Sequence, residues 1–334
     1  MDSQQIRAEH NQIVGRYGPW TDHNIQLIDD IYTMDRSIVS DKLRRVLQIV
    51  SDMARKPVAE LRILDLACLE GGYAIEFARQ GARVVAIEGR EANIEKARFS
   101  KRVLGLDNLE LIQGDVRSLS RAVHGSFDVV LCLGILYHLD APDVFSFVEK
   151  IGEVCDGFAV FDTYVSLEQK RSYPYNGATL WGRDIQEHTQ DDSQEEKLQD
   201  LWASIENLKS VWMTTPTLLN LLSRSGFTSC YECHVPVELN KPSDRITLLA
   251  VKGQTMRVIN SPLSNDILAA ELPEVMVRKP SHHQAPFADA SRQITGLVPR
   301  SLRRGVKNAL RSVGILKSES TPWKAPPSDK SPGA

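Results

Sequence analysis

The sequence predicts an α/β fold centred on a doubly wound sheet of five parallel strands, closed at one edge by an antiparallel hairpin. The first observation is that short apolar runs alternate with amphipathic, helix-like stretches over residues 61–163. Strands that alternate with helices form parallel sheets with right-handed crossovers. The second is a pair of apolar runs, residues 227–235 and 245–251, which flank a turn-rich gap and predict the hairpin.

The stretch over residues 61–89 organises the rest of this domain. Ile63 to Ala67 is a short apolar run, typical of a strand buried on both faces of a sheet. Gly71 and Gly72 interrupt it, a helix-like spacing follows, and a second buried strand ends at Glu88. Glycines at such a turn let the backbone approach a ligand, and an acid at the tip of the second strand is placed to bind ribose hydroxyls. This order predicts a nucleotide-binding half-sheet.

The remaining elements are predicted from the same apolar spacing. Strands are expected over residues 108–113, 126–133 and 157–163. Helices are expected over residues 36–54, 90–104, 142–154 and 214–225. The last helix also has threonine at its start, Pro216 in its first turn and Gly226 after its end, which are boundary signals.

Two segments around the α/β domain of residues 61–253 are expected to close over a substrate. Residues 1–60 are interpreted as an N-terminal helical cap. Residues 164–211 form an insertion that is too long for a plain connector, which predicts a lid. The acidic run within it, residues 191–196, is interpreted as the start of a solvated helix.

The C-terminal extension, residues 254–334, is expected to contain a basic amphipathic helix and a disordered end. Residues 291–334 hold nine basic side chains and two acidic ones, a local charge of +7 on a chain whose total is −3. A basic face opposite an apolar one is typical of helices on anionic membranes or acidic partners. The alternative, which we favour, is that the helix docks on the α/β domain or stays disordered.

The composition argues against several classes of protein. With 40 basic and 43 acidic residues, no global positive charge favours nucleic acid. The chain has no run of about 18 apolar residues and its start lacks a signal-peptide core, so a cytoplasmic protein without a membrane span is expected. Cys230 and Cys233 lie in a predicted strand, where side chains three apart point to opposite faces. We therefore expect no metal or redox pair there.

The stretch Asp65 to Gly72, DLACLEGG, resembles the first motif of class I S-adenosylmethionine-dependent methyltransferases, usually D/E-x-G-x-G-x-G. Ala67 and Leu69 replace the first two glycines, and Glu70 lies inside the loop. An acid before the turn repels a pyrophosphate but suits the cationic amino-acid end of S-adenosylmethionine. The order of elements over residues 61–253 also resembles this family and implies its Rossmann-like sheet.

The resemblance implies which residues bind S-adenosylmethionine. Its methionine end is expected against Asp65 and the loop residues Ala67, Cys68, Glu70, Gly71 and Gly72. The ribose hydroxyls are expected at Glu88, and the adenine amine at Asp115 with the backbone of Val116 beside it. Leu133 and Gly134 end the fourth strand, where the family presents the methyl group. Strand-end carboxylates also cap helices, which is the structural alternative for each acid.

The fourth-strand motif, LGILYHLDAP over residues 133–142, offers Tyr137 and His138 as candidate catalytic residues. An imidazole near neutral pH takes a proton from a hydroxyl or carboxyl nucleophile. The alternative is a histidine that only hydrogen-bonds to the cap. The motif lacks the Asp/Asn-Pro-Pro-Tyr sequence of many amino-group methyltransferases, which favours an oxygen acceptor.

Within this motif, GILYHLDAP also resembles bacterial enzymes that build 5-oxyacetyl groups on the tRNA wobble uridine, using carboxy-S-adenosylmethionine. The missing basic surface disfavours tRNA, because phosphate contacts dominate such affinity. We therefore predict a methyltransferase that acts on an oxygen of a small-molecule or glycan-type substrate. The alternatives are a tRNA wobble-uridine (carboxy)methyltransferase and a non-catalytic subunit with a cofactor fold.

Overall fold

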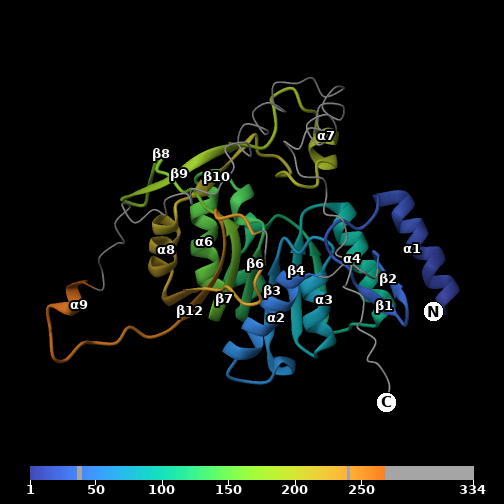
Figure 1. Ribbon diagram of the computed structural model, residues 1–334, viewed down its shortest axis with the longest axis horizontal. Helices are drawn as coiled ribbons and strands as arrows, with labels where there is room; N and C mark the ends of the chain where they lie inside the picture. The colour runs from blue at the N-terminus through green and yellow to red at the C-terminus, as the bar shows by residue number, and fades with distance from the viewer. Residues whose placement is uncertain (36–39, 239–240, 268–334) are drawn as a thin grey trace, which may run out of the picture. The chain divides into compact units, whose positions relative to one another are not determined.

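The computed structural model describes residues 1–35, 40–238 and 241–267. Its central sheet has seven strands in the order β11-β12-β7-β6-β3-β4-β5 (Figure 1). These strands are β3 (Arg62–Leu66), β4 (Arg83–Glu88), β5 (Leu109–Gln113), β6 (Phe127–Leu133), β7 (Cys155–Tyr164), β11 (Phe227–Glu232) and β12 (Arg245–Lys252). Strands β3 to β7 pair in parallel, and β12 lies antiparallel between β7 and β11. The predicted sheet and its closing hairpin are confirmed.

Helices cover both faces of this sheet, as the alternation of elements requires. They are α2 (Asp41–Met53), α3 (Gly72–Arg79), α4 (Glu91–Leu104), α5 (Arg121–His124), α6 (Asp143–Val154) and α8 (Thr215–Arg224), with 3₁₀ turns η1 (Val58–Glu60), η2 (Val116–Ser118) and η3 (Leu136–His138). Along β3, Ile63 joins the core under α2, α3 and α4, whereas Leu64 and Leu66 join the core under α6 and α8. Both cores are continuous apolar layers, which explains why the strands are apolar on both faces.

The N-terminal segment contains α1 (Ser3–Tyr17) and a short hairpin of β1 (Gln26–Ile28) and β2 (Ile31–Tyr32). Helix α1 packs along α4. Its start is fixed by a capping box, in which Asp2 accepts from the backbone of Gln5 and the Gln5 side chain accepts from the backbone of Asp2. The helix agrees with the helical cap expected in this segment. Only Ile6 of it is fully buried, so its apolar spacing is weak and its bounds were not predictable.

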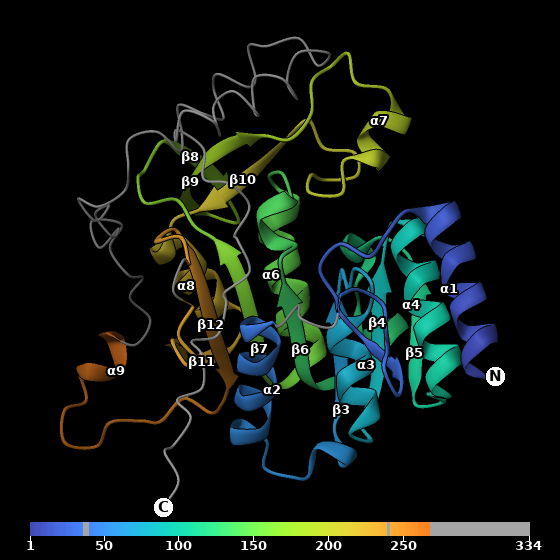
Figure 2. The ribbon, with the colours of Figure 1, turned by 45° about the vertical axis from the view of Figure 1, so that its right-hand side comes forward.

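The insertion between β7 and α8 folds as a sheet of its own. It contains β8 (Arg171–Tyr175), β9 (Ala178–Gln186), α7 (Gln194–Gln199) and β10 (Lys209–Met213), with the three strands antiparallel in the order β10-β9-β8 (Figure 2). Val211 N donates to Leu139 O at 2.9 Å, which fixes β10 beside η3. Helix α7 starts at Ser193 with a capping box. The acidic run therefore does mark a helix start.

The last described element is a short helix, α9 (Ser264–Ile267). The expected basic helix and disordered end of the C-terminal extension fall within residues 268–334, outside the described part of the chain. In the part that is described, no helix has both the length and the apolar character needed to cross a membrane.

Candidate active site

The residues expected to bind a cofactor collect at the carboxyl ends of β3, β4, β5 and β6. Strand order reverses between β3 and β6, because β4 and β5 lie on one side of β3 whereas β6 and β7 lie on the other. Ligands of doubly wound sheets bind outside the carboxyl ends of the strands at such a reversal. The fold therefore brings the predicted residues to one edge of the sheet.

The loop after β3 keeps a glycine-type backbone although it lacks two glycines. Ala67, Leu69 and Gly71 have φ of 54°, 51° and 82°, so every second residue is left-handed. A left-handed non-glycine residue costs about 1–2 kcal/mol. Cys68 N donates to Ile87 O at 3.0 Å, and Leu69 N donates to Glu88 Oε2 at 2.9 Å. These bonds hold the loop in this conformation against the local strain.

Asp65 lies directly before this loop and has an unused acceptor atom. Its side chain is 1% exposed, and its Oδ2 atom has no hydrogen-bond partner among the residues that the structure describes. Burial is the main reason that the pKa of Asp65 rises to about 7; Glu88 raises it further, while a backbone bond from Ala74 and the charge of Lys42 lower it. A buried acceptor without a donor suits the ammonium group at the methionine end of S-adenosylmethionine.

The affinity of the protein for S-adenosylhomocysteine is expected to rise as the pH increases from about 6 to about 8. An ammonium group binds the ionised carboxylate, so below the pKa of about 7 the Asp65 proton must be released on binding. The dissociation constant then changes by up to roughly tenfold per pH unit and levels off above that pKa. Calorimetry across this pH range measures the slope. Asp65→Asn should flatten it, and an equal slope in this variant would contradict the assignment.

Glu88, at the end of β4, is buried and accepts bonds from the loop and from the start of α4. Its Oε2 accepts from Leu69 N, and its Oε1 accepts from Arg90 N at 2.8 Å and from Asn93 Nδ2 at 3.4 Å. Burial raises the pKa of Glu88, although these bonds and the charge of Arg90 lower it in part. The carboxylate thus joins the glycine-type loop to the next strand, at the position expected for the ribose.

Asp115 and Val116 follow β5 as predicted, but Asp115 is already engaged. Its oxygens accept from the backbone and side chain of Arg117, each at 2.8 Å. It therefore caps η2, and its contact with adenine stays a prediction. Val116 is buried beside it.

Glu70 has a different role from the one predicted for it. It is fully buried, and its two oxygens accept from Thr21 N, Asp22 N, His23 N and Lys96 Nζ, at 2.8–3.3 Å. Its carboxylate is thus committed to the N-terminal segment and to α4, so we withdraw it from the cofactor ligands.

Gly72 is likewise explained by the N-terminal segment. A Cβ atom at Gly72 would lie 2.6 Å from Cγ of His23. The His23 ring occupies this space because its Nδ1 accepts from Gly72 N at 2.9 Å, at the start of α3. The N-terminal segment therefore fixes the loop from outside.

His138 lies on η3, directly after β6, and binds a carboxylate that the sequence analysis did not identify. Its Nδ1 lies 3.1 Å from Glu187 Oε1 and 3.2 Å from Oε2. A carboxylate only accepts, so Nδ1 carries the proton and Nε2 is left as an acceptor. Nε2 makes no hydrogen bond to any described residue. This arrangement orients the imidazole for proton abstraction through Nε2.

Glu187 follows β9 in the insertion and is held as an anion. Ser204 N donates to Oε2 at 2.9 Å, and Ser210 Oγ donates to Oε1 at 2.6 Å. Burial alone raises the pKa of Glu187, but the hydrogen bond and charge of His138, with the two serine bonds, outweigh it and leave the pKa below its usual range. A fixed carboxylate of this kind sets the tautomer and direction of its histidine.

Tyr137 and Gly134 lie together beside this histidine. The rings of Tyr137 and His138 are 4.3 Å apart, and a Cβ at Gly134 would be 3.7 Å from the Tyr137 hydroxyl. Gly134 has a φ of 113°, which a side chain would strain. Leu133 is half-buried at the end of β6. The two candidate catalytic residues are thus next to the place where the methyl group is expected.

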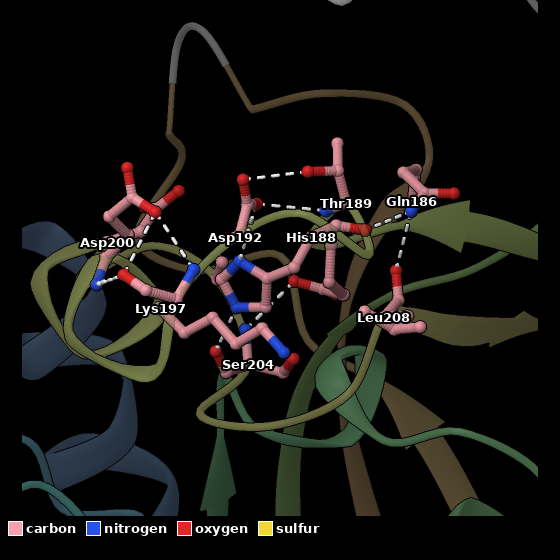
Figure 3. A network of polar contacts seen from close by, with 12 residues as sticks. Gln186, His188, Thr189, Asp192, Lys197, Asp200, Ser204 and Leu208 are labelled. Carbon is pink, nitrogen blue, oxygen red and sulfur yellow. Dashed lines mark hydrogen bonds and ion pairs between the residues drawn. The ribbon is translucent and has the colours of Figure 1, made fainter.

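The same insertion also reaches the end of β4. The guanidinium of Arg90 donates to backbone carbonyls of residues 197–204, among them Leu198 O at 2.6 Å and Ala203 O at 2.8 Å. Figure 3 shows the polar network in this segment, in which His188 Nε2 donates to Ser204 O at 2.6 Å. A Cβ at Gly89 would lie 2.6 Å from Cδ1 of Ile205. The insertion therefore packs directly beside Glu88.

Comparison with known proteins identifies the core. Residues 63–156 match the family model described as a methyltransferase domain. Residues 63–156 are thus a methyltransferase domain. In structure, it resembles the N-terminal domain of EvdMO1 crystallised in the presence of SAH and D-fucose, with a TM-score of 0.59 and 22% identity. That alignment covers 76% of this chain and 98% of the EvdMO1 domain.

Curated relatives match the methyltransferase domain over short stretches. A ubiquinone biosynthesis O-methyltransferase of Methylocella silvestris is 38% identical over 99 residues, which are 30% of this chain and 37% of that protein. A 23S rRNA (uracil(1939)-C(5))-methyltransferase of Shewanella halifaxensis is 37% identical over 60 residues, 18% of this chain and 14% of that protein. The chain thus spans little more than a third, or less, of these relatives.

Several residues of the site could not be found from the motifs of the methyltransferase domain. Glu187 stands in the insertion, far from His138 in the sequence, and no spacing signal links the two. Lys96 on helix α4 and Glu70 in the loop after β3 form a buried ion pair, with Nζ and Oε1 3.1 Å apart. The sequence does hold one weak signal of the Glu70–Lys96 pair. Glu70 is the one acid in a loop of small and apolar residues, and such an acid favours a fixed cationic partner.

Proposed function

We propose that the protein transfers a methyl group from S-adenosylmethionine to an oxygen nucleophile of a small-molecule or glycan-type substrate. The observation that carries this proposal is the His138–Glu187 pair, which leaves Nε2 as an acceptor and packs beside Tyr137, whose hydroxyl adjoins Gly134. A hydroxyl or carboxylic acid must lose a proton when it attacks a methyl group, and a positioned imidazole is the usual base for that step. The O-methyltransferase relative and the D-fucose in the EvdMO1 crystal support the acceptor class.

In this reaction the protein mainly positions the reactants and excludes water. S-adenosylmethionine supplies an activated methyl group on a positively charged sulfur. Asp65 offers its unpaired Oδ2 to the ammonium end, and Glu88 offers its remaining lone pairs to the ribose. His138 takes the proton of the acceptor at Nε2, and Glu187 stabilises the imidazolium that results.

The acceptor can be identified with isotopically labelled methyl donor and metabolite extracts. Wild-type protein is expected to label a compound with a free hydroxyl or carboxyl group. His138→Ala, which leaves the cofactor residues in place, is the matched control and should label it far less. Label found only on a nitrogen or carbon atom would contradict the oxygen assignment.

Glu88→Ala is expected to weaken S-adenosylhomocysteine binding by about 1.5–3 kcal/mol, the scale for losing hydrogen bonds to a charged group. This corresponds to roughly 10- to 150-fold in the dissociation constant. Calorimetry measures it, and Glu110→Ala, an exposed acid on the neighbouring strand β5, is the control. Equal affinities in wild type and Glu88→Ala would remove Glu88 from the site.

A further inference from the structure

A cluster of charged side chains lies at the carboxyl end of β7. Asp162 of β7 is 1% exposed. Arg245, the first residue of β12, donates to Asp162 Oδ1 from Nε at 2.8 Å and from Nη2 at 2.7 Å, and Thr247 Oγ1 donates to Oδ2 at 2.8 Å. Two ammonium groups adjoin this carboxylate: Lys42 Nζ is 3.6 Å from Oδ1, and Lys241 Nζ is 3.8 Å from Oδ2.

Positive charge exceeds negative charge in this cluster. Arg45 pairs with Glu238, which lies 3.7 Å from Lys241 Nζ. The group therefore contains four cations and two carboxylates, listed as Lys42, Arg45, Lys241 and Arg245 against Asp162 and Glu238. All four cationic side chains are at least three-quarters buried. Partly buried charge without a counter-ion is costly, so the excess favours an anionic ligand.

Several hydrogen-bond donors near the Asp162 cluster have no acceptor among the described residues. Lys42 Nζ and the hydroxyls of Tyr73, Tyr137 and Tyr164 donate to none of the residues that the structure describes. Lys42 lies 6.0 Å from the Tyr73 ring centre, and Arg245 lies 5.2 Å from that of Tyr164. The Tyr137 and Tyr164 rings are 4.9 Å apart. Burial is the main cause that raises the pKa of Tyr137 to about 12, so its hydroxyl remains a donor at neutral pH.

We propose that Lys42, Lys241 and Arg245, with the Tyr137 hydroxyl, bind a carboxylate or phosphate group of the methyl acceptor. Such groups only accept hydrogen bonds and carry the charge that the cluster lacks. Tyr137 connects the two places. Its hydroxyl adjoins Gly134, and its ring packs on the ring of Tyr164, over which the guanidinium of Arg245 lies. The proposal rests on the proposed function and names the acceptor more closely, as an anionic molecule.

The test uses the full-length protein saturated with S-adenosylhomocysteine and inorganic phosphate as the probe. Phosphate, compared with chloride at equal ionic strength, is expected to raise the thermal unfolding midpoint in a saturable way. Lys42→Met and Lys241→Met should weaken the apparent phosphate affinity by at least about tenfold each, a loss of about 1.4 kcal/mol. Lys42 makes no hydrogen bond to the described residues, so Lys42→Met removes charge without leaving a protein acceptor unpaired.

Lys56→Met is the matched control. Lys56 pairs with Asp128 at 2.9 Å near the amino end of β6, at the opposite edge of the sheet. Its phosphate response should equal that of the wild type. A wild type that does not respond to phosphate, or a control that loses the response as the two variants do, would overturn the proposal.

Affinity for the cofactor separates the possible sources of the anion. Above about pH 8, where Asp65 is ionised with or without the charge of Lys42, Lys42→Met and Lys241→Met should bind S-adenosylhomocysteine within about twofold of the wild type. A tenfold loss would assign the ammonium groups to the carboxylate of the cofactor itself. Carboxy-S-adenosylmethionine that bound about 100-fold tighter than S-adenosylmethionine, and only with Lys42 present, would assign them to the donor. Either result overturns the acceptor assignment, whereas no binding of S-adenosylhomocysteine at all would instead remove the proposed function.

Discussion

Replacing His138 with alanine is expected to lower kcat for methyl transfer by about 10²–10⁴-fold, the usual contribution of a general base. Affinity for S-adenosylhomocysteine should stay within about twofold, because the imidazole bonds to Glu187 and not to the residues proposed to bind the cofactor. Kinetics with the acceptor identified by labelling measure kcat, and calorimetry measures the affinity.

Two further variants separate catalysis from folding. Glu187→Gln removes the charge that stabilises the imidazolium, so it should lower kcat while sparing cofactor affinity. His234→Ala changes an exposed histidine that lies 3.9 Å from Glu232, and it should behave as the wild type. Unchanged kcat in His138→Ala would leave His138 with a structural role only.

Glu70→Ala is expected to lower the free energy of unfolding by about 3–5 kcal/mol, the cost of breaking a buried ion pair by removing one partner. Lys96 Nζ is fully buried and lies 3.1 Å from Glu70 Oε1. Without Glu70, the carbonyl of Pro19, at 2.7 Å, is the one acceptor that Lys96 Nζ keeps within the described part of the chain. Three backbone amides of the N-terminal segment lose their acceptor as well. Urea unfolding measures the change.

The double variant Glu70→Ala/Lys96→Met completes this experiment. It removes the uncompensated charge, so it should recover part of the stability lost in Glu70→Ala. Glu95→Ala is the control, because Glu95 pairs with Arg98 at 2.6 Å on the exposed side of α4. Exposed pairs contribute about 0–1 kcal/mol. A loss in Glu70→Ala no larger than that of the control would contradict the account.

The fold could be predicted from the sequence because its signals are local. Buried strands are continuous apolar runs, and helix α8 carries Thr214, Pro216 and Gly226 at its boundaries. The bounds of helix α1, within the expected helical cap, were not predictable because it buries few residues. The sheet of the insertion escaped because its strands mix exposed and buried positions without a clean alternation.

Positions at strand ends could be predicted from the sequence. Asp65 and Glu88 lie near the ends of β3 and β4, and His138 lies on the turn η3 after β6; their roles in the site stay predictions. Partners from distant parts of the chain were not predictable. Glu187 is 49 residues from His138, and Arg245 is 83 residues from Asp162. Glu70 was misassigned because the loop sequence does not reveal that the N-terminal segment supplies its donors.

The segment between β9 and β10 has a consequence for the order of events in a catalytic cycle. It supplies Glu187 to His138 and also packs Ile205 against Gly89, next to the expected ribose site. We expect exchange of the cofactor to displace the segment that aligns the base. We expect the enzyme to be inactive while this segment is displaced. The cofactor should therefore bind first and the acceptor second, and the demethylated cofactor should leave last.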